Sequence, residues 1–246
     1  MKTISTCSAF ALALLLLPAA ASLRSQQPAA VTKLRTNSIE GLEVHTAKLD
    51  ATEALETTAE TVNYRGRRAI RLINKAGHTP AGTPANGETI AILKGSDFKN
   101  GTIEAELLAV PRPGAQSGVR GFVGIAFRVA PHGAQYECLS LRITNGRADE
   151  QLRRNHTTQY SSFPDFPWHR LREENPGLYE SYADIDEAAW TKIRITVAGT
   201  QAKLYVNGAA QPALLVNDLK LGDTRGQIAL WVGTDTEAYF SDVTVK

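Results

Sequence analysis

The sequence predicts an all-β protein folded as a two-sheet antiparallel β-sandwich. The first observation is a series of about eleven or twelve short segments in which apolar and polar residues alternate, separated by turn residues at regular intervals. The second is that no ten-residue segment with helical periodicity lies between them. A parallel sheet with crossover helices is therefore not expected, and one sandwich domain suits the length of the chain.

The first residues have the three parts of a secretory signal peptide. Lys2 gives a basic start, residues 9–17 are an apolar run, and "PAAAS" supplies small residues suited to cleavage near Ala21. The apolar run is too short to span a bilayer, and no later segment has the length of a membrane span. The sequence thus predicts export to the periplasm or the extracellular space.

The signal peptide is residues 1–21, and the chain that remains after its removal has two parts. Residues 22–41 form a polar lead, and residues 42–246 are expected to form the sandwich domain. The formal charge of the whole chain is +2, so no broad electrostatic attraction to nucleic acid is expected. The sequence leaves the oligomeric state open.

Only Cys138 remains after cleavage, so no internal disulfide can form. It lies in an apolar strand pattern, where a buried and inert thiol is expected. The segment "NYRGRR" around Gly66 predicts a hairpin turn. Alternation in two other strands predicts a buried face that contains Ile103, Ala105, Leu107, Ile193, Ile195 and Val197, and an exposed face that contains Glu104, Glu106, Lys192 and Arg194.

Two segments interrupt the strands. Residues 76–87 are rich in glycine and proline and are expected to be a connecting loop. Residues 145–189, here called the insert, form the one long segment without a strand pattern. Structureless segments of this length are uncommon in compact domains and usually carry function. The insert is therefore the first place to look for a site.

The order of the strands adds a family resemblance. "FKNGTIEAEL", "GIAFRV" followed by "YECLSLR", "WTKIRITVAGTQAKLYVNG", and "GQIALWVG" followed by "AYFSDVTV" together resemble the concanavalin A-like lectin/glucanase superfamily over residues 42–246. The chain is similar in particular to 3-keto-disaccharide hydrolase-type domains and to laminin-G-like modules. This resemblance implies a jelly roll whose concave sheet, or the loops over it, meets carbohydrate.

The resemblance also assigns residues. It matches Arg128 and Glu137 to an arginine and a glutamate of the central strand pair. It implies as well a structural calcium ion between the first and last strands, for which Asp242 is the natural carboxylate, although the chain has no Asp-rich calcium loop. Glucanases of the superfamily carry a compact Glu-x-Asp-x-x-Glu strand. This chain lacks that motif, since "ESYADIDE" at 180–187 has other spacing and lies in the insert.

The insert offers side chains that suit a saccharide. Aromatic rings stack on the apolar faces of sugars, and Tyr160 and Trp168 are candidates for this contact. His156 and His169 could act as a base or as ligands, although their spacing matches no zinc motif. Arg172 could hold a carboxylate or a sugar hydroxyl through its forked donors. The alternatives are a satellite core for the rings and ordinary surface pairs for the arginine.

The strand "YECLSLR" supplies further candidates. If its leucines face the core, Tyr136 and Arg142 face away from it and are available to a ligand. Strict alternation places Glu137 with the core residues, where a buried carboxyl group needs a partner. The family resemblance instead implies that Glu137 points outward, and the sequence leaves the two orientations open.

Three functions are consistent with these observations. The first is an exported protein that binds saccharide at the concave sheet under the insert. The second is a hydrolase or lyase that acts on 3-keto glycosides, with His156 or Glu137 as general base and Arg128 or Arg172 stabilising developing negative charge. The third is a laminin-G-like module that binds a protein. Fold alone does not decide among them.

Overall fold

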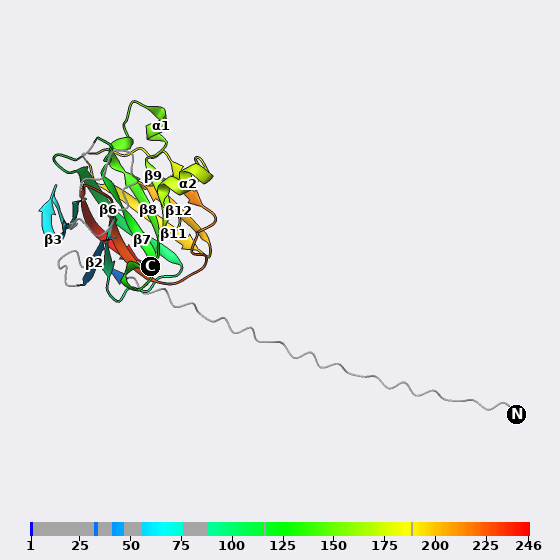
Figure 1. The fold of residues 1–246 in the computed structure, drawn as a ribbon. Helices are drawn as coiled ribbons and strands as arrows, with labels where there is room; N and C mark the ends of the chain where they lie inside the picture. The colour runs from blue at the N-terminus through cyan, green and yellow to red at the C-terminus, as the bar shows by residue number, and fades with distance from the viewer. Residues whose placement is uncertain (2–31, 34–40, 47–55, 76–87, 116, 188) are drawn as a thin grey trace.

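The computed structural model describes residues 1, 32–33, 41–46, 56–75, 88–115, 117–187 and 189–246. The predicted signal peptide, apart from Met1, and the predicted loop at 76–87 lie outside these residues. The described chain folds into two antiparallel β-sheets packed face to face, as the sequence predicts (Figure 1). Among the described residues, no helix has the length and apolar character that a bilayer crossing requires.

The first sheet has eight strands and is built around β6 and β15. In spatial order its strands are β13 (Leu214–Val216), β12 (Gln201–Val206), β11 (Thr191–Ala198), β6 (Gly101–Pro111), β15 (Thr236–Val245), β4 (Arg67–Lys75) and β3 (Glu56–Tyr64), with β1 (Thr32–Lys33) paired to β15.

The second sheet has seven strands and is built around β7 and β8. In spatial order its strands are β10 (Glu180–Ser181), β9 (Thr158–Phe163), β8 (Tyr136–Arg142), β7 (Phe122–Val129), β14 (Gln227–Val232), β5 (Thr89–Leu93) and β2 (Leu42–Thr46). Four short helical segments connect strands: η1 (Pro131–Gly133), η2 (Ile143–Asn145), α1 (Gln151–Arg154) and α2 (Trp168–Glu174).

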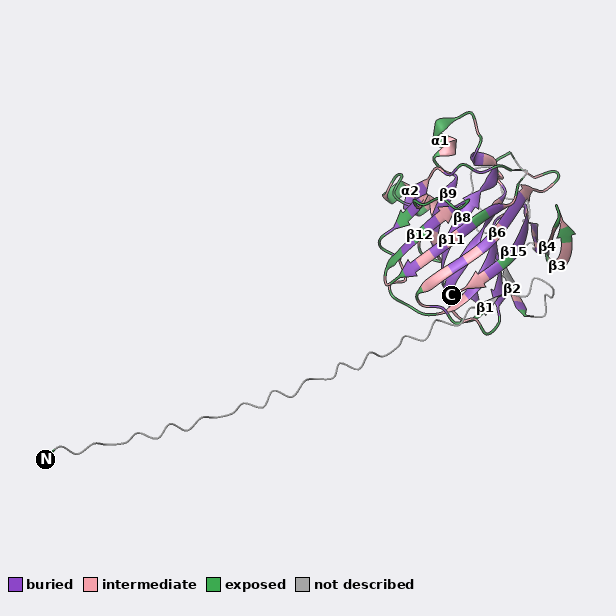
Figure 2. Ribbon diagram, turned by 180° about the vertical axis from the view of Figure 1, so that it is seen from behind, coloured by how far each residue is buried: buried purple, intermediate pink, exposed green. Residues whose placement is uncertain are grey.

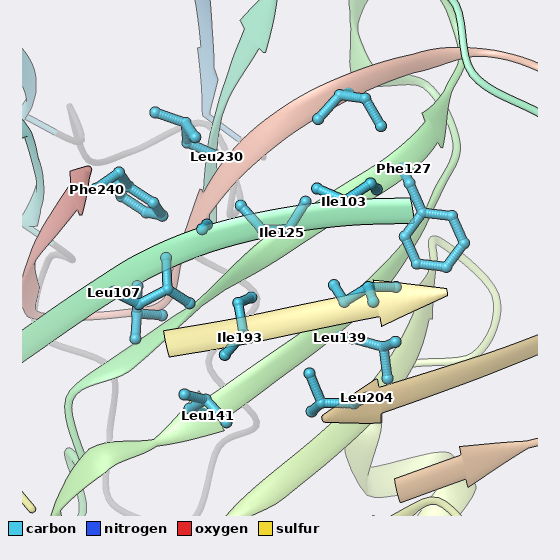
Figure 3. Close-up of a cluster of buried hydrophobic side chains, with 14 of the residues drawn as sticks. Ile103, Leu107, Ile125, Phe127, Leu139, Leu141, Ile193, Leu204, Leu230 and Phe240 are labelled. Atoms are coloured by element: carbon cyan, nitrogen blue, oxygen red, sulfur yellow. The ribbon is translucent and has the colours of Figure 1, made fainter. Parts of the chain in front are cut away.

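The main core lies between the inner faces of the two sheets (Figure 3). Both sheets contribute fully buried side chains, which are large and apolar and interdigitate across the gap. Those labelled in Figure 3 are Ile125, Phe127, Leu139, Leu141 and Leu230 from the seven-stranded sheet and Ile103, Leu107, Ile193, Leu204 and Phe240 from the eight-stranded sheet.

The predictions of strand faces are confirmed. Ile103, Ala105 and Leu107 are buried while the two glutamates between them are half-buried, and β11 alternates in the same way. The hairpin at Gly66 is also confirmed, because β3 and β4 pair up to Tyr64 opposite Arg67. Cys138 is a free, buried cysteine. The period-two pattern therefore identified which side of these strands meets the core.

One segment differs from the sequence prediction. Of the predicted polar lead, the structure describes residues 32–33, which form β1 and pair with the last strand, and residue 41. The insert, expected to be irregular, contains β9, β10, α1 and α2. Its strand β9 pairs with β8 along six residues and so extends the seven-stranded sheet. The prediction failed there because "TQYSSF" alternates only weakly, with polar residues on both faces.

The outer face of the seven-stranded sheet is buried as well. Every residue of β8 is buried (Figure 2). A second apolar cluster lies on this face and contains Ile90, Ile92, Ala126, Val129, Tyr136, Cys138, Ala229 and Trp231. Tyr136 and Arg142 do face away from the main core, as predicted, but they lie in a covered layer and not in open solvent.

Candidate functional site

The insert returns to the end of β8 and surrounds its last residue. Within β8, β9 and β10, cross-strand pairing sets Ser140, Gln159 and Glu180 in one row on the outer face of the sheet. Arg142 follows Ser140 by two residues and so points to the same side. Helix α2 lies beside β9, and its residues Trp168 and Arg172 are four apart, so that they share one helix face.

These elements bring six side chains together, which we call the Glu180 cluster: Arg142, His156, Gln159, Trp168, Arg172 and Glu180. They come from β8, the turn before β9, β9 itself, α2 and β10. These segments are spread over residues 142 to 180 of the chain. The pairing of β8 with β9 and of β9 with β10 is what brings their side chains together.

Glu180 is the centre of the cluster. Its Oε1 accepts a hydrogen bond of 2.6 Å from Nη1 of Arg142 and another from Nη2 of Arg172, and its Oε2 accepts one of 2.8 Å from Nε of Arg172. Arg142 donates further hydrogen bonds to Oε1 of Gln159 at 2.7 Å and to the carbonyl oxygen of His156 at 3.2 Å. The carboxylate is thus fully engaged by charge-assisted bonds.

The arginines keep Glu180 ionised although its side chain is only 2% exposed. Burial by itself would raise the pKa of a carboxyl group. Here burial is opposed by the hydrogen bonds and charges of Arg172 and Arg142, which together hold the pKa of Glu180 below its usual 4.5. At neutral pH the cluster therefore contains one buried carboxylate and two guanidiniums.

His156 lies against the same carboxylate. Its Nδ1 is 3.0 Å from Oε2 of Glu180, although the two atoms are not aligned for a hydrogen bond. Burial lowers the pKa of His156 below 6.5, and the charges of Arg172 and Arg142 lower it further, against the opposing effect of Glu180. These surroundings favour the neutral form of the ring. Nδ1 is the ring nitrogen that faces the carboxylate, so Nε2 is the nitrogen that faces away from it.

The cluster has a buried floor and a more exposed rim. Glu180 and Gln159 are buried, and the side chain of Arg142 is 9% exposed. At the rim, the side chains of His156 and Arg172 are 20% and 34% exposed, and Trp168 is half-buried. The floor is therefore held by the protein, whereas a ring, an imidazole and a guanidinium reach solvent.

The rim ring is held by cations. The Cζ atoms of Arg172 and Arg142 lie 4.6 Å and 5.3 Å from the centroid of the Trp168 ring. His169 meets the same ring edge-on at 5.6 Å between centroids. Guanidinium groups stack favourably on indole faces, and Glu180 holds both guanidiniums in place. The orientation of Trp168 is thus set before any ligand arrives.

Glu137 and Tyr160, which we expected at the site, lie in the core instead. The Tyr160 hydroxyl donates a hydrogen bond of 2.6 Å to Oε2 of Glu137, and the backbone N–H of Leu221 donates one of 2.8 Å to Oε1. Both side chains are on the inner face and have no exposed surface. The inward orientation that alternation predicts is the observed one, and no ligand reaches either group.

Arg128 is also a structural residue. It sits at a positive φ of 54°, next to the register shift between β7 and β14. Its buried guanidinium donates to the carbonyl oxygens of Lys99, Gly199 and Gly222 and to the side chain of Asn100. These donors are used up inside the protein, so Arg128 is not placed to stabilise charge on a substrate.

Tyr136 lies on the outer face, as predicted, but only 2% of its surface is exposed. Its ring stacks on Phe163 with centroids 5.0 Å apart, and its hydroxyl donates a hydrogen bond of 3.1 Å to Glu88. Tyr136 is therefore a buried member of the second apolar cluster. A ligand would have to displace neighbouring residues to touch it.

The two remaining candidates lie apart from Glu180. His169 is half-buried, and its buried Nδ1 has no hydrogen-bond partner in the described part of the chain. Asp242 is on β15 in the other sheet, where Arg67 lies between it and Glu106, at 3.4 Å and 3.6 Å. A guanidinium thus stands between the two carboxylates, and these residues do not fit the predicted calcium ion. The described residues form no group of three metal-binding side chains.

Sequence reasoning missed two members of the cluster. Glu180 appeared only as part of a motif with the wrong spacing, and Gln159 was not singled out. No local signal singles out Glu180, which lies eight residues beyond Arg172 with Glu173 and Glu174 nearer in sequence. Gln159 meets its partner Arg142 only because β9 pairs with β8, and this pairing is a property of the tertiary structure.

A separate hollow lies on the outer face of the eight-stranded sheet. Its volume is about 260 Å³, and it is lined by Glu104, Lys192, Ile193, Arg194, Tyr205 and Gly208. Arg194 covers the Tyr205 ring at 3.8 Å, and Glu104 pairs with Lys246 at 3.1 Å. The Glu104 and Lys246 side chains at this hollow are 26% and 50% exposed, so it lacks the buried, charged floor of the Glu180 cluster and is the weaker candidate.

Comparison with solved structures agrees with the fold. The chain is similar to the carbohydrate binding module CBM66 from Bacillus subtilis, with a TM-score of 0.50 and 13% identity over 78% of this chain and 95% of that one. At this identity the similarity shows a shared β-sandwich fold. No protein-family model matches the chain, and neither does any curated protein.

Two further solved structures are similar at lower scores. One is a protein of unknown function with a galectin-like fold from Bacillus subtilis, with a TM-score of 0.48 and 12% identity over 78% of this chain and 87% of that one. The other is a β-1,3-1,4-glucanase (lichenase) derived from a mouse hindgut metagenome, with a TM-score of 0.49 and 11% identity over 87% of this chain and 97% of that one.

Proposed function

We propose that this protein binds saccharide at the Glu180 cluster. The observation that carries the proposal is the half-buried Trp168 ring, held by Arg142 and Arg172, which are themselves anchored on a buried carboxylate. A preoriented aromatic face beside forked polar donors suits a sugar ring, whose faces are apolar and whose edge carries hydroxyl groups. Rigid rim groups also lose little entropy on binding.

The fold supports the same function. The solved structure with the TM-score of 0.50 is a carbohydrate binding module, so a sandwich of this kind serves saccharide binding in that protein. A shared fold does not transfer a site. The argument for this chain therefore rests on its own cluster, and the fold supplies the scaffold.

We further propose that the protein binds saccharide after its export. The signal peptide at residues 1–21 would direct it across the membrane, and cleavage near Ala21 would release it to the periplasm or outside the cell. N-terminal sequencing of the exported protein should begin within a few residues of position 22. A product that keeps Met1 would contradict export by this route.

The test of binding is a calorimetric titration of the exported protein with a panel of neutral and acidic oligosaccharides. Trp168→Ala should reduce the affinity for the bound saccharide at least about fivefold, since an aromatic contact of this kind contributes on the order of 1 kcal/mol or more. Trp190→Ala is the matched control, because Trp190 is also half-buried and has Arg67 over its ring at 5.7 Å on the other sheet. Equal affinity in the two variants would refute the proposed site.

A second candidate function is cleavage of 3-keto glycosides with His156 as base. The observation in its favour is the partly exposed imidazole of His156, whose pKa is lowered by burial and whose Nδ1 faces Glu180, because Nε2 is then the nitrogen left to act as a base. A ketone acidifies the neighbouring C–H, so such a base could remove that proton. His156→Ala should then retain binding and lose turnover of 3-keto disaccharides. Turnover by the variant at the native rate would exclude this function, and loss of saccharide binding would instead make His156 a binding residue.

A further inference from the structure

We infer that the saccharide bound at the Glu180 cluster carries a carboxylate, which Arg172 receives at the rim. This inference rests on the proposed function and adds the chemical class of the ligand. It follows from an excess of guanidiniums over carboxylates at this end of the sheet, and from the donors of Arg172 that remain unused.

The first observation is that the cations of the cluster repel one another. Burial lowers the pKa of Arg142, and although Glu180 opposes this, the charges of Arg172 and Arg120 lower it further. Burial lowers the pKa of His156 as well, and the charges of Arg172 and Arg142 lower it further against the effect of Glu180. Glu180 therefore does not neutralise its surroundings, because this one carboxylate faces the two guanidiniums of the cluster and a third, that of Arg120, also acts on Arg142. An anion that arrives here relieves repulsion that already exists.

The second observation extends the positive charge along α1. Burial lowers the pKa of Arg120, and the charge of Arg153 lowers it further, against the attraction of Glu150. Arg154 donates a hydrogen bond of 2.9 Å to the hydroxyl of Tyr182, two residues beyond Glu180. The buried Nε of Arg154 has no hydrogen-bond partner among the described residues. The guanidiniums of Arg120, Arg153 and Arg154 thus add to those of Arg142 and Arg172 at this end of the sheet.

The third observation locates the receiving group. Arg142 is almost fully buried, and both its Nη atoms already donate within the protein. Arg172 is one-third exposed and uses only its Nε–Nη2 edge on Glu180. A guanidinium has five donors in a planar fork, so the Nη1–Nη2 edge of Arg172 remains for a second carboxylate. The Cζ atom of the same guanidinium lies 4.6 Å from the centroid of the Trp168 ring that the saccharide would contact.

A planar carboxylate fits this edge better than a hydroxyl group does. It can accept two parallel charge-assisted hydrogen bonds, which are about twice as strong as those to neutral acceptors. A uronic acid places such a carboxylate on the rim of a sugar ring whose face is free to stack. One saccharide unit could therefore meet Trp168 and Arg172 together.

The experiment compares each acidic oligosaccharide with its own methyl ester. Oligomers of galacturonate, glucuronate, mannuronate and guluronate are titrated into the exported protein in acid and esterified form, with sulfated neutral oligomers as a third arm. We expect at least one acid to bind about tenfold or more tighter than its ester at low salt. High salt should reduce the difference, because an exposed ion pair is screened.

The matched variants are Arg172→Gln and Arg170→Gln. Both residues lie on α2 and pair with a glutamate, but Arg170 pairs with Glu174, away from the cluster. We expect Arg172→Gln to abolish the preference for the acid and Arg170→Gln to keep it. Arg172→Lys, which retains the charge without the fork, should keep part of the preference and shows whether a loss reflects misfolding.

The outcomes separate the inference from the proposed function. Equal affinity for acid and ester overturns the carboxylate inference and leaves saccharide binding intact. Tighter binding of sulfated than of uronate oligomers also overturns it, in favour of a different anion. If no saccharide of any class binds, the proposed function fails and this inference fails with it.

Discussion

At the scale of single residues, two carboxyl groups over the outer face of the seven-stranded sheet are driven in opposite directions. Burial raises the pKa of Glu88 to about 7, against the hydrogen bond from Tyr136, which is a neutral donor. Glu180 is held below its usual value, since Arg172 and Arg142 outweigh its burial. The partner decides the charge, because a buried carboxylate is stable only beside a cation.

Glu88→Gln tests the first of these states. The pKa of Glu88 is raised from 4.5 in the unfolded chain to about 7, so its contribution to stability is complete below pH 4.5 and is lost as the pH rises through 7. At each pH we compare the free energy of unfolding of the variant with that of the native protein. We expect this difference to favour the variant by about 1 to 3 kcal/mol more at pH 8 than at pH 4. The range is set below the full value of the pKa shift because Glu88 as a whole is half-buried. Urea unfolding at the two pH values measures the change.

The control is Gln201→Asn, which exchanges one exposed neutral side chain for another on β12. Its stability difference from the native protein should be the same at both pH values. A Glu88 variant that behaves like this control would show that the carboxyl group is hydrated and ionised in the folded protein.

At the scale of elements, the seven-stranded sheet depends on the close approach of β7 to β8. Gly124 pairs with Ser140, in the row that continues to Gln159 and Glu180. A Cβ atom at Gly124 would lie 2.5 Å from the carbonyl oxygen of Leu139 and 2.7 Å from the Cα atom of Ser140. Both are backbone atoms, so the strands themselves would have to separate.

Gly124→Ala is therefore expected to lower the free energy of unfolding by about 1 to 3 kcal/mol, the usual cost of overpacking a core. Denaturant unfolding measures it. Gly118→Ala, where a Cβ meets nothing within 4 Å, should change stability by less than about 0.5 kcal/mol. If Gly124→Ala is as stable as this control, the tight pairing of β7 with β8 would be incorrect.

At the scale of the whole molecule, Arg128 ties one end of the sandwich together. It extends from β7 of the seven-stranded sheet, while Lys99 precedes β6 and Gly199 lies in the turn between β11 and β12 of the other sheet. Gly222 lies in the connection from β13 to β14, which passes from one sheet to the other. One buried side chain thus satisfies backbone carbonyls from segments that are far apart in sequence.

Arg128→Ala should lower the free energy of unfolding by more than about 3 kcal/mol, because several buried carbonyl groups would lose their donor at once. Thermal and denaturant unfolding measure the loss. Arg225→Ala is the control. Arg128 lies 3.4 Å from Asp223, and Arg225 likewise pairs with an aspartate, at 2.6 Å from Asp97, but its side chain is 58% exposed. That variant should lose less than about 1 kcal/mol. A similar small loss in Arg128→Ala would mean that water replaces the guanidinium.

Strand positions and faces were predictable from the sequence because a strand exposes its two sides to different surroundings over a few consecutive residues. Ile193, Ile195 and Val197 alternate with polar residues, and the structure buries them as expected. The inward direction of Glu137 followed from the same rule, although the family resemblance implied the opposite. Local periodicity was the better guide at that residue, since the carboxyl group finds Tyr160 inside the core.

The candidate site was only partly predictable. Arg142, His156, Trp168 and Arg172 were identified by residue type, and the structure brings them together, whereas Tyr160, Glu137 and Arg128 were assigned to the site and belong to the interior. The insert was expected to cross the sheet as an irregular lid. It instead adds β9 and β10 to the sheet edge, so that the site lies at the end of the sheet.

The sequence by itself determined the β-sandwich class and the inner face of most strands. The fold class and the strand faces follow from the period-two alternation of apolar and polar residues, which can be read directly along the sequence. Only the tertiary structure decided which charges meet, because Arg142 and Glu180 are brought together by the pairing of β8, β9 and β10. Whether an arginine serves the interior or the rim depends on the carbonyl and carboxylate groups that folding places around it. For that reason Arg128 and Arg172, which were candidates for the same role at the level of sequence, have different roles in the folded protein.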